Sequence, residues 1–171
     1  MRYYVAPGIG GNTWASAGDL VSTLNHVINN PSPIHDDEIW ARQGTYNLAG
    51  NPLVINQNTA PLSIYGGFAG WENTLCDRDA NIISNDPDFP DFFQNPSILD
   101  GGGSVGWTNR VIEMQGANVC RIDGFVVRNG NAGTGDGGGL YVHGRNIWLE
   151  NLVIMNNVAG NNGGGILVGN V

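Results

Sequence analysis

The chain has no lysine, because all seven of its basic residues are arginine. Without lysine, Schiff-base catalysis, a phosphate-loop lysine and a lysine general base are excluded. Fifteen acidic residues give the 171-residue chain a formal net charge of −8 at pH 7. So acidic a chain is disfavoured as a partner of a nucleic-acid backbone or an anionic membrane. We therefore expect no nucleic-acid partner.

Long hydrophobic runs are also missing. No apolar stretch approaches the roughly 20 residues that span a bilayer, so we expect no membrane insertion. The first residues, MRYYVAPG, lack the basic and then apolar layout of a secretory signal. Either a signal peptide was removed from a secreted chain, or none existed.

Cysteine is scarce. Cys76 and Cys120 are too few for a disulfide framework, and neither lies in a metal-binding spacing, so they leave the cellular compartment open. In the repeat described below, Cys120 aligns with the inward-facing Ile147. This alignment favours a buried structural thiol over a reactive one at Cys120. Cys76 falls in a predicted loop, where the sequence decides nothing.

Glycine, by contrast, is abundant, with 27 residues, and 41% of the chain is hydrophobic. This hydrophobic share argues against general disorder, so we expect the glycines at turns. Glycine triplets at 137–139 and 163–165 belong to an internal repeat of about 26 to 28 residues. A shift of 27 positions aligns Cys120 with Ile147, Ile122 with Leu149, Phe125 with Leu152, Val127 with Ile154, Asn129 with Asn156 and Ala132 with Ala159. A second series aligns Ile112, Leu140 and Ile166, and then Met114, Val142 and Val168.

Apolar residues alternate within each repeat, which is the periodicity of strands. Each repeat therefore predicts three short strands separated by Gly and Asn corners, which is one turn of a parallel β-solenoid. Glycine permits a positive φ at tight corners, and asparagine tolerates the same conformation. We expect Asn129 to stack over Asn156 and to begin a ladder of amide hydrogen bonds.

The alternation also predicts which side chains face outward. The inward set is Ile147, Leu149, Leu152 and Ile154. On the exterior we expect Arg121 above Trp148, Asp123 near Glu150, and Arg128 near Met155. Arg121 could then stack on the indole of Trp148. Arg121, Trp148 and Glu150 are the candidate contacts for a ligand or partner.

Upstream of the repeats, residues 16–30 predict an amphipathic helix with Leu20, Leu24, Val27 and Ile28 on one face. Residues 37–46 predict a strand and a turn, and residues 52–56 and 61–68 predict early strands of the solenoid. We expect one domain over 1–171. Residues 1–50 would form an N-terminal cap that contains the helix, and 51–171 would form the coils.

The order YYVAPG, TWASAGDLVSTLN, DEIWARQGTY, LSIYGGFAGWE, SILDGG, IDGFVVRNGNA, GGGLYV and NNVAGNNGGGI resembles the N-terminal part of bacterial right-handed parallel β-helix surface proteins. The triple-glycine and asparagine-rich elements are also similar to the repeats of polymorphic outer membrane proteins. The resemblance covers nearly the whole chain and is weakest over 77–95. It implies an all-β, right-handed parallel β-helix of the pectate-lyase type with an N-terminal capping helix, secreted or displayed on a bacterial surface.

An acidic excursion is expected at about 76–96. Its residues Asp86, Asp88 and Asp91 could bind Ca²⁺, although their spacing matches no EF-hand, and a solvated acidic loop is the alternative. No other cofactor is indicated. The three histidines, His26, His35 and His143, show no metal spacing.

The tryptophans could stack on sugar rings. Only Trp148 is predicted to point outward, whereas Trp14 and Trp40 are expected between the cap helix and the first strands. A hydrolase would need two carboxylates such as Asp123 and Glu150, but stacking places these two closer than glycosidases require.

The last predicted strand ends in GGGILVGNV, and its residues Ile166, Val168 and Val171 would form an open edge. A truncated chain, a poorly ordered end and pairing with another molecule are the three explanations. Pairing between copies would be heterologous and would propagate as a filament. We therefore expect a noncatalytic structural or adhesive surface protein that self-associates or binds a surface glycan or protein receptor. The alternative is a carbohydrate-binding or polysaccharide-degrading β-helix.

Overall fold

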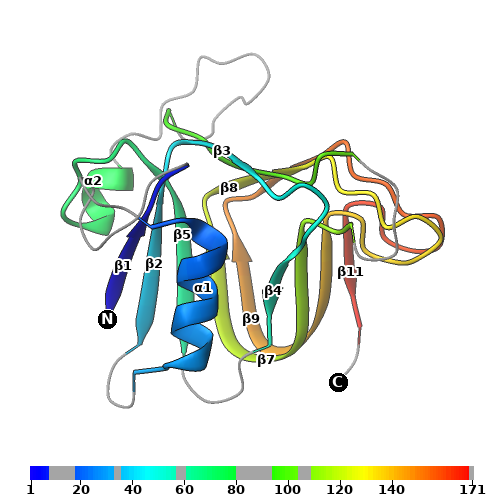
Figure 1. Ribbon diagram of the computed structural model, residues 1–171, viewed down its shortest axis with the longest axis horizontal. Helices are drawn as coiled ribbons and strands as arrows, with labels where there is room; N and C mark the ends of the chain where they lie inside the picture. The colour runs from blue at the N-terminus through cyan, green and yellow to red at the C-terminus, as the bar shows by residue number, and fades with distance from the viewer. Residues whose placement is uncertain (8–17, 33–35, 57–60, 80–93, 104–108, 170–171) are drawn as a thin grey trace.

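The computed structural model describes residues 1–7, 18–32, 36–56, 61–79, 94–103 and 109–169 (Figure 1). Its larger sheet contains β1 (Arg2–Val5), β2 (Asp37–Arg42), β4 (Leu53–Ile55), β5 (Leu62–Phe68), β7 (Ile112–Asp123), β9 (Leu140–Glu150) and β11 (Ile166–Val168). Its smaller sheet contains β3 (Gly44–Asn47), β6 (Ser97–Asp100), β8 (Phe125–Arg128) and β10 (Val153–Met155). The two helices are α1 (Leu20–Asn29) and α2 (Leu75–Asp79).

The chain is mostly β, and the strand pairs of both sheets are parallel. The larger sheet has the order β1-β2-β5-β7-β9-β11, with β4 also paired to β7, and the smaller sheet has the order β10-β8-β6-β3. Figure 1 shows β7 and β9 curving together, so the larger sheet is curled. The parallel β architecture expected from the repeats is thus observed.

The strand registers confirm the repeat read from the sequence. Cys120 is paired with Ile147, and Ile122 with Leu149. In the smaller sheet, residues of β8 are likewise paired with residues of β10 that lie 27 positions later, such as Val127 with Ile154. The second series of aligned residues is also confirmed, since Ile112 is paired with Leu140, and Leu140 is paired with Ile166.

A positive φ recurs at the bends of successive repeats, one repeat apart. The pairs are Val119 (φ 55°) and Asn146 (52°), Gly124 (84°) and Asn151 (49°), and Asn129 (57°) and Asn156 (54°). Glycine and asparagine adopt this left-handed conformation more readily than other residues, which explains their frequency at these corners. Chain direction therefore changes at matched positions, and the strands between them stay in register.

The amide of Asn129 has a different partner from the one expected. Its Nδ2 donates to both carboxylate oxygens of Asp100 at 3.1 Å, and Arg128 Nε donates to Oδ2 of the same residue at 2.8 Å. Partial burial would raise the pKa of Asp100, but hydrogen bonds from Gly102 N, Asn129 and Arg128 outweigh it and lower that pKa. Asn129 was expected to bond to Asn156, one repeat later. Its partner is instead Asp100, on the neighbouring strand one repeat earlier.

The first glycine triplet lies where backbones of neighbouring repeats nearly touch. A Cβ atom on Gly138 would lie 2.2 Å from the carbonyl oxygen of Val158, and one on Gly139 would lie 2.5 Å from that of Gly165. No side chain fits such a gap. The triplet is thus explained by close backbone approach between repeats, in addition to the positive φ of 64° at Gly137.

The main hydrophobic core lies between the two sheets and α1. In the larger sheet, Ile39 is paired with Ile64, Ile64 with Ile122, and Ile122 with Leu149. The three isoleucines are fully buried, and Leu149 packs against them. The inward direction predicted for Ile147, Leu149, Leu152 and Ile154 is confirmed, because all four pack on this core.

Helix α1 is shorter than predicted. Gly18 exchanges backbone hydrogen bonds with Tyr4 and Ala6, so the chain is still extended beside β1 at that point. The helix begins at Leu20, where the Asp19 side chain accepts a hydrogen bond from Ser22 N. The predicted apolar face is present, with Leu20, Leu24 and Val27 buried and Ile28 packed beside them.

Two features concern the first 50 residues, which we expected to form an N-terminal cap. β2 and β3 belong to the larger and smaller sheets, so the sheets include residues before 51. Trp40 does not pack beneath α1. Ile39 and Ala41 take the inward positions of β2, so Trp40 points outward and stacks on Phe68 at 4.5 Å between ring centroids.

We predict that Gly138→Ala destabilises the protein because the added methyl group overlaps the Val158 carbonyl. Gly164→Ala is the matched control. Gly164 occupies the same position of the second triplet, where the nearest atom to an added Cβ lies at 3.3 Å. Urea unfolding should show a loss of about 1–3 kcal/mol for Gly138→Ala and a smaller change for the control. Equal effects would contradict the close packing of repeats.

Candidate ligand groove on the outer sheet face

Outward side chains of the larger sheet form two rows across its strands. The first row contains Glu38, Ser63, Arg121 and Trp148, which are successive register partners on β2, β5, β7 and β9. The second row contains Trp40, Tyr65, Asp123 and Glu150 on the same strands. The predicted placement of Arg121 beside Trp148 and of Asp123 beside Glu150 is confirmed.

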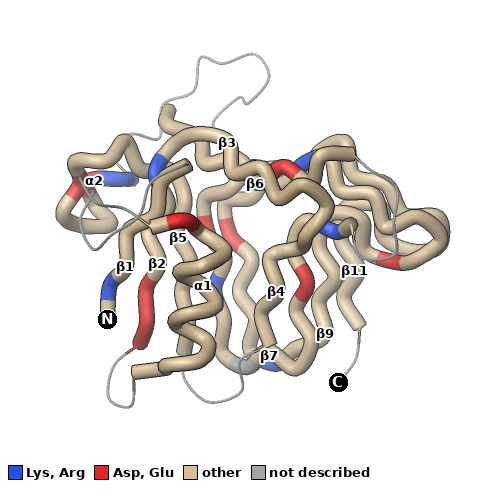
Figure 2. The backbone as a smooth tube through the Cα atoms, viewed as in Figure 1, with Lys and Arg blue, Asp and Glu red and all other residues tan. Residues whose placement is uncertain are grey.

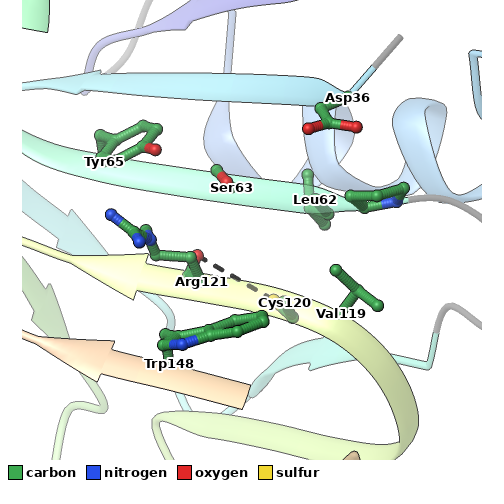
Figure 3. Close-up of a pocket in the computed structure, with 9 residues that line it drawn as sticks. Asp36, Leu62, Ser63, Tyr65, Val119, Cys120, Arg121 and Trp148 are labelled. Atoms are coloured by element: carbon green, nitrogen blue, oxygen red, sulfur yellow. Dashed lines mark hydrogen bonds between the residues drawn. The ribbon is translucent and has the colours of Figure 1, made fainter. Parts of the chain in front are cut away.

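A groove of about 340 Å³ lies over the first row (Figure 3). Its lining includes Asp36, Ser63, Tyr65, Arg121 and Trp148. Serine is the smallest side chain of this row, and its larger neighbours Glu38 and Arg121 stand on the strands to either side. The groove therefore includes the position at which the row has its smallest side chain, Ser63.

Two of the three predicted contact residues line this groove. The Trp148 side chain points outward, as predicted, and the residue is 44% exposed. Arg121 Nη1 lies 3.3 Å from Glu150 Oε2 in an ion pair whose side chains are both more than a third exposed. An ion pair at such exposure contributes little to stability. Glu150 does not line the groove, but it is paired with Arg121, which does. Because this ion pair is weak, the Arg121 guanidinium can leave Glu150 for a ligand at low cost.

The second row is covered, which the sequence did not predict. Asp123 is buried and is paired with Arg78 of α2, whose Nη2 lies 3.2 Å from Oδ2. Asn151 Nδ2 donates to the other carboxylate oxygen at 2.9 Å. Arg78 also donates to the Gly66 carbonyl and lies over the ring of Tyr65. Asp123 therefore has its charge and its hydrogen bonds satisfied inside the protein.

Helix α2 lies within the segment that was predicted as an acidic loop from about residue 76. In the sequence, the feature that could have indicated packing on the sheet is Arg78, which stands between the aspartates of CDRD and is paired with Asp123 of β7. Beside it, the buried Glu72 accepts hydrogen bonds from the backbone amides of Ala69, Gly70 and Trp71. These bonds hold a turn that displays Trp71, an exposed residue that does not line the groove.

Cys120 lies at the base of the groove and is 2% exposed. Burial raises the pKa of its thiol to about 12, so the group stays protonated at neutral pH. The expectation of a buried structural thiol is confirmed. Cys76 is exposed on α2.

Val119 gives the groove a strained rim. Its φ of 55° is unusual for a β-branched residue, whereas the equivalent Asn146 tolerates the same conformation. Such strain costs roughly 1–3 kcal/mol and tends to occur at functional sites. Val119 lines the groove, so the strained backbone places an apolar side chain against it.

The remaining predicted sites have different outcomes. Ile166 and Val168 lie on β11 and are exposed, while Val171 lies outside the described residues, so the assembly edge stays a prediction. Asp86, Asp88 and Asp91 of the calcium hypothesis also lie outside them, as do Trp14, Trp107 and His35. Within the part of the chain that the structure describes, no group of three or more His, Cys, Asp or Glu residues is placed to hold a metal ion.

Two histidines of the described chain have aromatic neighbours. His26 meets Tyr3 edge to face, and His143 stacks on Tyr141 at 4.7 Å between ring centroids. They lie on different elements, α1 and β9.

Figure 2 shows that the charged residues are scattered along the chain. Several of them form ion pairs between neighbouring strands, such as Arg2 with Glu38 and Arg128 with Asp100.

We predict that the buried ion pair behaves differently from the exposed one. Asp123→Asn removes the carboxylate charge that is paired with the buried Arg78 and should cost about 3–5 kcal/mol of unfolding free energy. Joint replacement, Arg78→Met with Asp123→Leu, should recover much of that loss. The matched control is Glu150→Gln, which breaks the exposed pair with Arg121 and should cost less than about 1 kcal/mol. Similar costs for Asp123→Asn and Glu150→Gln in urea unfolding would contradict the burial of Asp123.

Comparison of the chain with protein-family models, with curated proteins and with solved structures found no match. None of the described helices is both long enough and apolar enough to span a membrane. The groove and its surroundings are therefore the basis of the functional argument.

Proposed function

We propose that the chain is a right-handed parallel β-helix that acts as a noncatalytic structural or adhesive protein, secreted or displayed on a bacterial surface. Three observations support the β-helix. Strands one repeat apart are paired in parallel, aliphatic residues stack in columns inside them, and positive φ angles recur at the corners. These are the features of a solenoid in which each repeat contacts only its neighbours.

One observation carries the noncatalytic assignment. Asp123 and Glu150 are the two carboxylates that stand directly opposite each other on β7 and β9, and each is paired with an arginine of the chain. Asp123 is buried beneath Arg78, where a substrate cannot reach it. A glycosidase needs two accessible carboxylates more than about 5 Å apart. This pair lacks one of them, while Trp148 and Arg121 remain accessible beside it.

Adhesion would use the open part of the outer face. A rigid sheet presents Trp148 and Arg121 at fixed positions, and tryptophan and arginine are the residues most enriched in binding hot spots. We propose a surface glycan or a protein receptor as the partner of this face.

Self-association along the solenoid axis is the second part of the proposal. Within the described residues, β11 is paired on one side only, with β9, and its Ile166 and Val168 are exposed. An exposed strand edge with apolar side chains is a template for another strand. A second copy of the chain would be its occupant, and the outer edge of its β1 would be only partly open, because Gly18 is already bridged to Val5.

The test combines a binding assay and a turnover assay on the purified chain. Arrays of glycans and of extracellular proteins should show binding, while the bound polysaccharides should yield neither reducing ends nor unsaturated products. Release of either product would contradict the noncatalytic assignment. Light scattering of the same samples should show association that increases with concentration, and a monomer at every concentration would contradict the self-association part.

A further inference from the structure

We propose that the outer groove binds a neutral saccharide, with one sugar ring stacked on the indole of Trp148. This inference rests on the proposed function and names the ligand class of the adhesive face.

Trp148 supplies the platform. Its indole borders the groove in Figure 3 and remains 44% exposed. The neighbours Ile147 and Leu149 pack into the core, so the backbone beneath the indole is fixed. An indole that is 44% exposed beside the described residues suits the apolar face of a pyranose ring. The platform therefore exists before a ligand arrives, which lowers the entropic cost of binding.

Polar groups from separate strands surround this platform. Ser63 and Tyr65 of β5, Arg121 of β7, and Asp36 beside β2 all line the groove. Together they offer hydroxyl groups, guanidinium donors and carboxylate acceptors. A sugar ring presents hydroxyl groups that both donate and accept, so this mixture matches it. The groove volume of about 340 Å³ lies at the lower end of the roughly 300–1,000 Å³ found for small-ligand sites.

The charges of the groove favour a neutral ligand. The Arg121 cation is already paired with Glu150, so it does not give the groove a net positive charge. Asp36 places an exposed carboxylate on the same lining, and the whole chain carries a formal charge of −8. A sulfated or uronic-acid glycan would meet this field as an anion and would be repelled. A neutral saccharide avoids that cost.

The position on the sheet disfavours an extended peptide. Peptides often bind by adding a strand to a free sheet edge. Here β5 and β7, which supply most of the groove lining, are paired on both sides, whereas β9 at Trp148 is paired with β7 alone because β11 is paired with β9 only at Leu140–Val142. Over β5 and β7 the groove has no free strand edge, so recognition there must come from side chains on the sheet face. A ligand whose polar groups are hydroxyls is recognised in that way.

The strain at Val119 is a further argument for a ligand. The equivalent position one repeat later holds Asn146, which tolerates a positive φ, yet Val119 keeps this conformation with a β-branched side chain. Its side chain contributes apolar surface to the groove rim. Strain that persists in this way is typical of binding sites.

The test compares two exposed tryptophans in the full chain. Neutral oligosaccharides identified on a glycan array are titrated by calorimetry into the wild-type protein, Trp148→Ala and Trp71→Ala. Trp148→Ala should weaken binding at least tenfold, and Trp148→Phe should keep it within about threefold because a ring face remains. Trp71→Ala is the matched control and should stay within twofold, because Trp71 does not line the groove. Thermal unfolding midpoints should remain similar for all three variants.

A second variant tests the rim. Val119→Asn should raise the unfolding midpoint, because asparagine tolerates the backbone conformation, and should weaken saccharide binding at least threefold. A raised midpoint with unchanged affinity would remove Val119 from the site.

Three outcomes would overturn the inference: unchanged affinity of Trp148→Ala, wild-type binding restricted to anionic glycans, or no glycan binding at all. Adhesion to a protein receptor or self-association with no glycan binding would leave the proposed function standing. Cleavage of a bound neutral saccharide would instead overturn the proposed noncatalytic function and leave the ligand class standing.

Discussion

Parallel pairing of each repeat with the next, in register, is the constraint on which the rest of the structure depends. It aligns the inward residues of neighbouring strands, so that Ile39, Ile64, Ile122 and Leu149 form one column across four strands. A shift of one residue would turn this column toward solvent and bring the outward residues into the core. Burial of the column therefore fixes the register, and the corner residues keep each turn of the chain compatible with it.

The same register creates the outer face. Because outward residues also align, Ser63, Arg121 and Trp148 lie side by side although they are far apart in the sequence. Helix α2 divides this face by covering Asp123 with Arg78 and leaving the first row open. One half of the face thus stabilises the fold, and the other half remains accessible to a ligand.

Much of this arrangement followed from the sequence because the repeat itself reports the register. An alignment of Cys120 with Ile147 fixes every neighbouring pair of those strands, including Arg121 with Trp148. Alternation then fixes which side chains face outward. The buried thiol of Cys120 followed from the same alignment.

The sequence did not predict the contacts made by residues that lie outside the repeats. Arg78 reaches Asp123 from a segment with no repeat and no strong helical pattern, so nothing local linked the two residues. Trp40 was expected between the cap helix and the first strands, but its position in the alternation of β2 turns it to the opposite face of the sheet. The start of α1 was misplaced because Gly18 continues the pairing with β1, a tertiary contact that a helical pattern does not contain.

The register can be measured directly with paired cysteines in a Cys76→Ser background. Arg121→Cys with Trp148→Cys places two thiols on directly opposed residues of β7 and β9, whose Cα atoms lie about 4.8 Å apart in adjacent strands. Arg121→Cys with Glu150→Cys is offset by two residues, about 8 Å, beyond the usual span of a disulfide. The account predicts that mild oxidation forms the first disulfide and not the second. Preferential formation of the second would contradict the stacking on which the groove and its ligand depend.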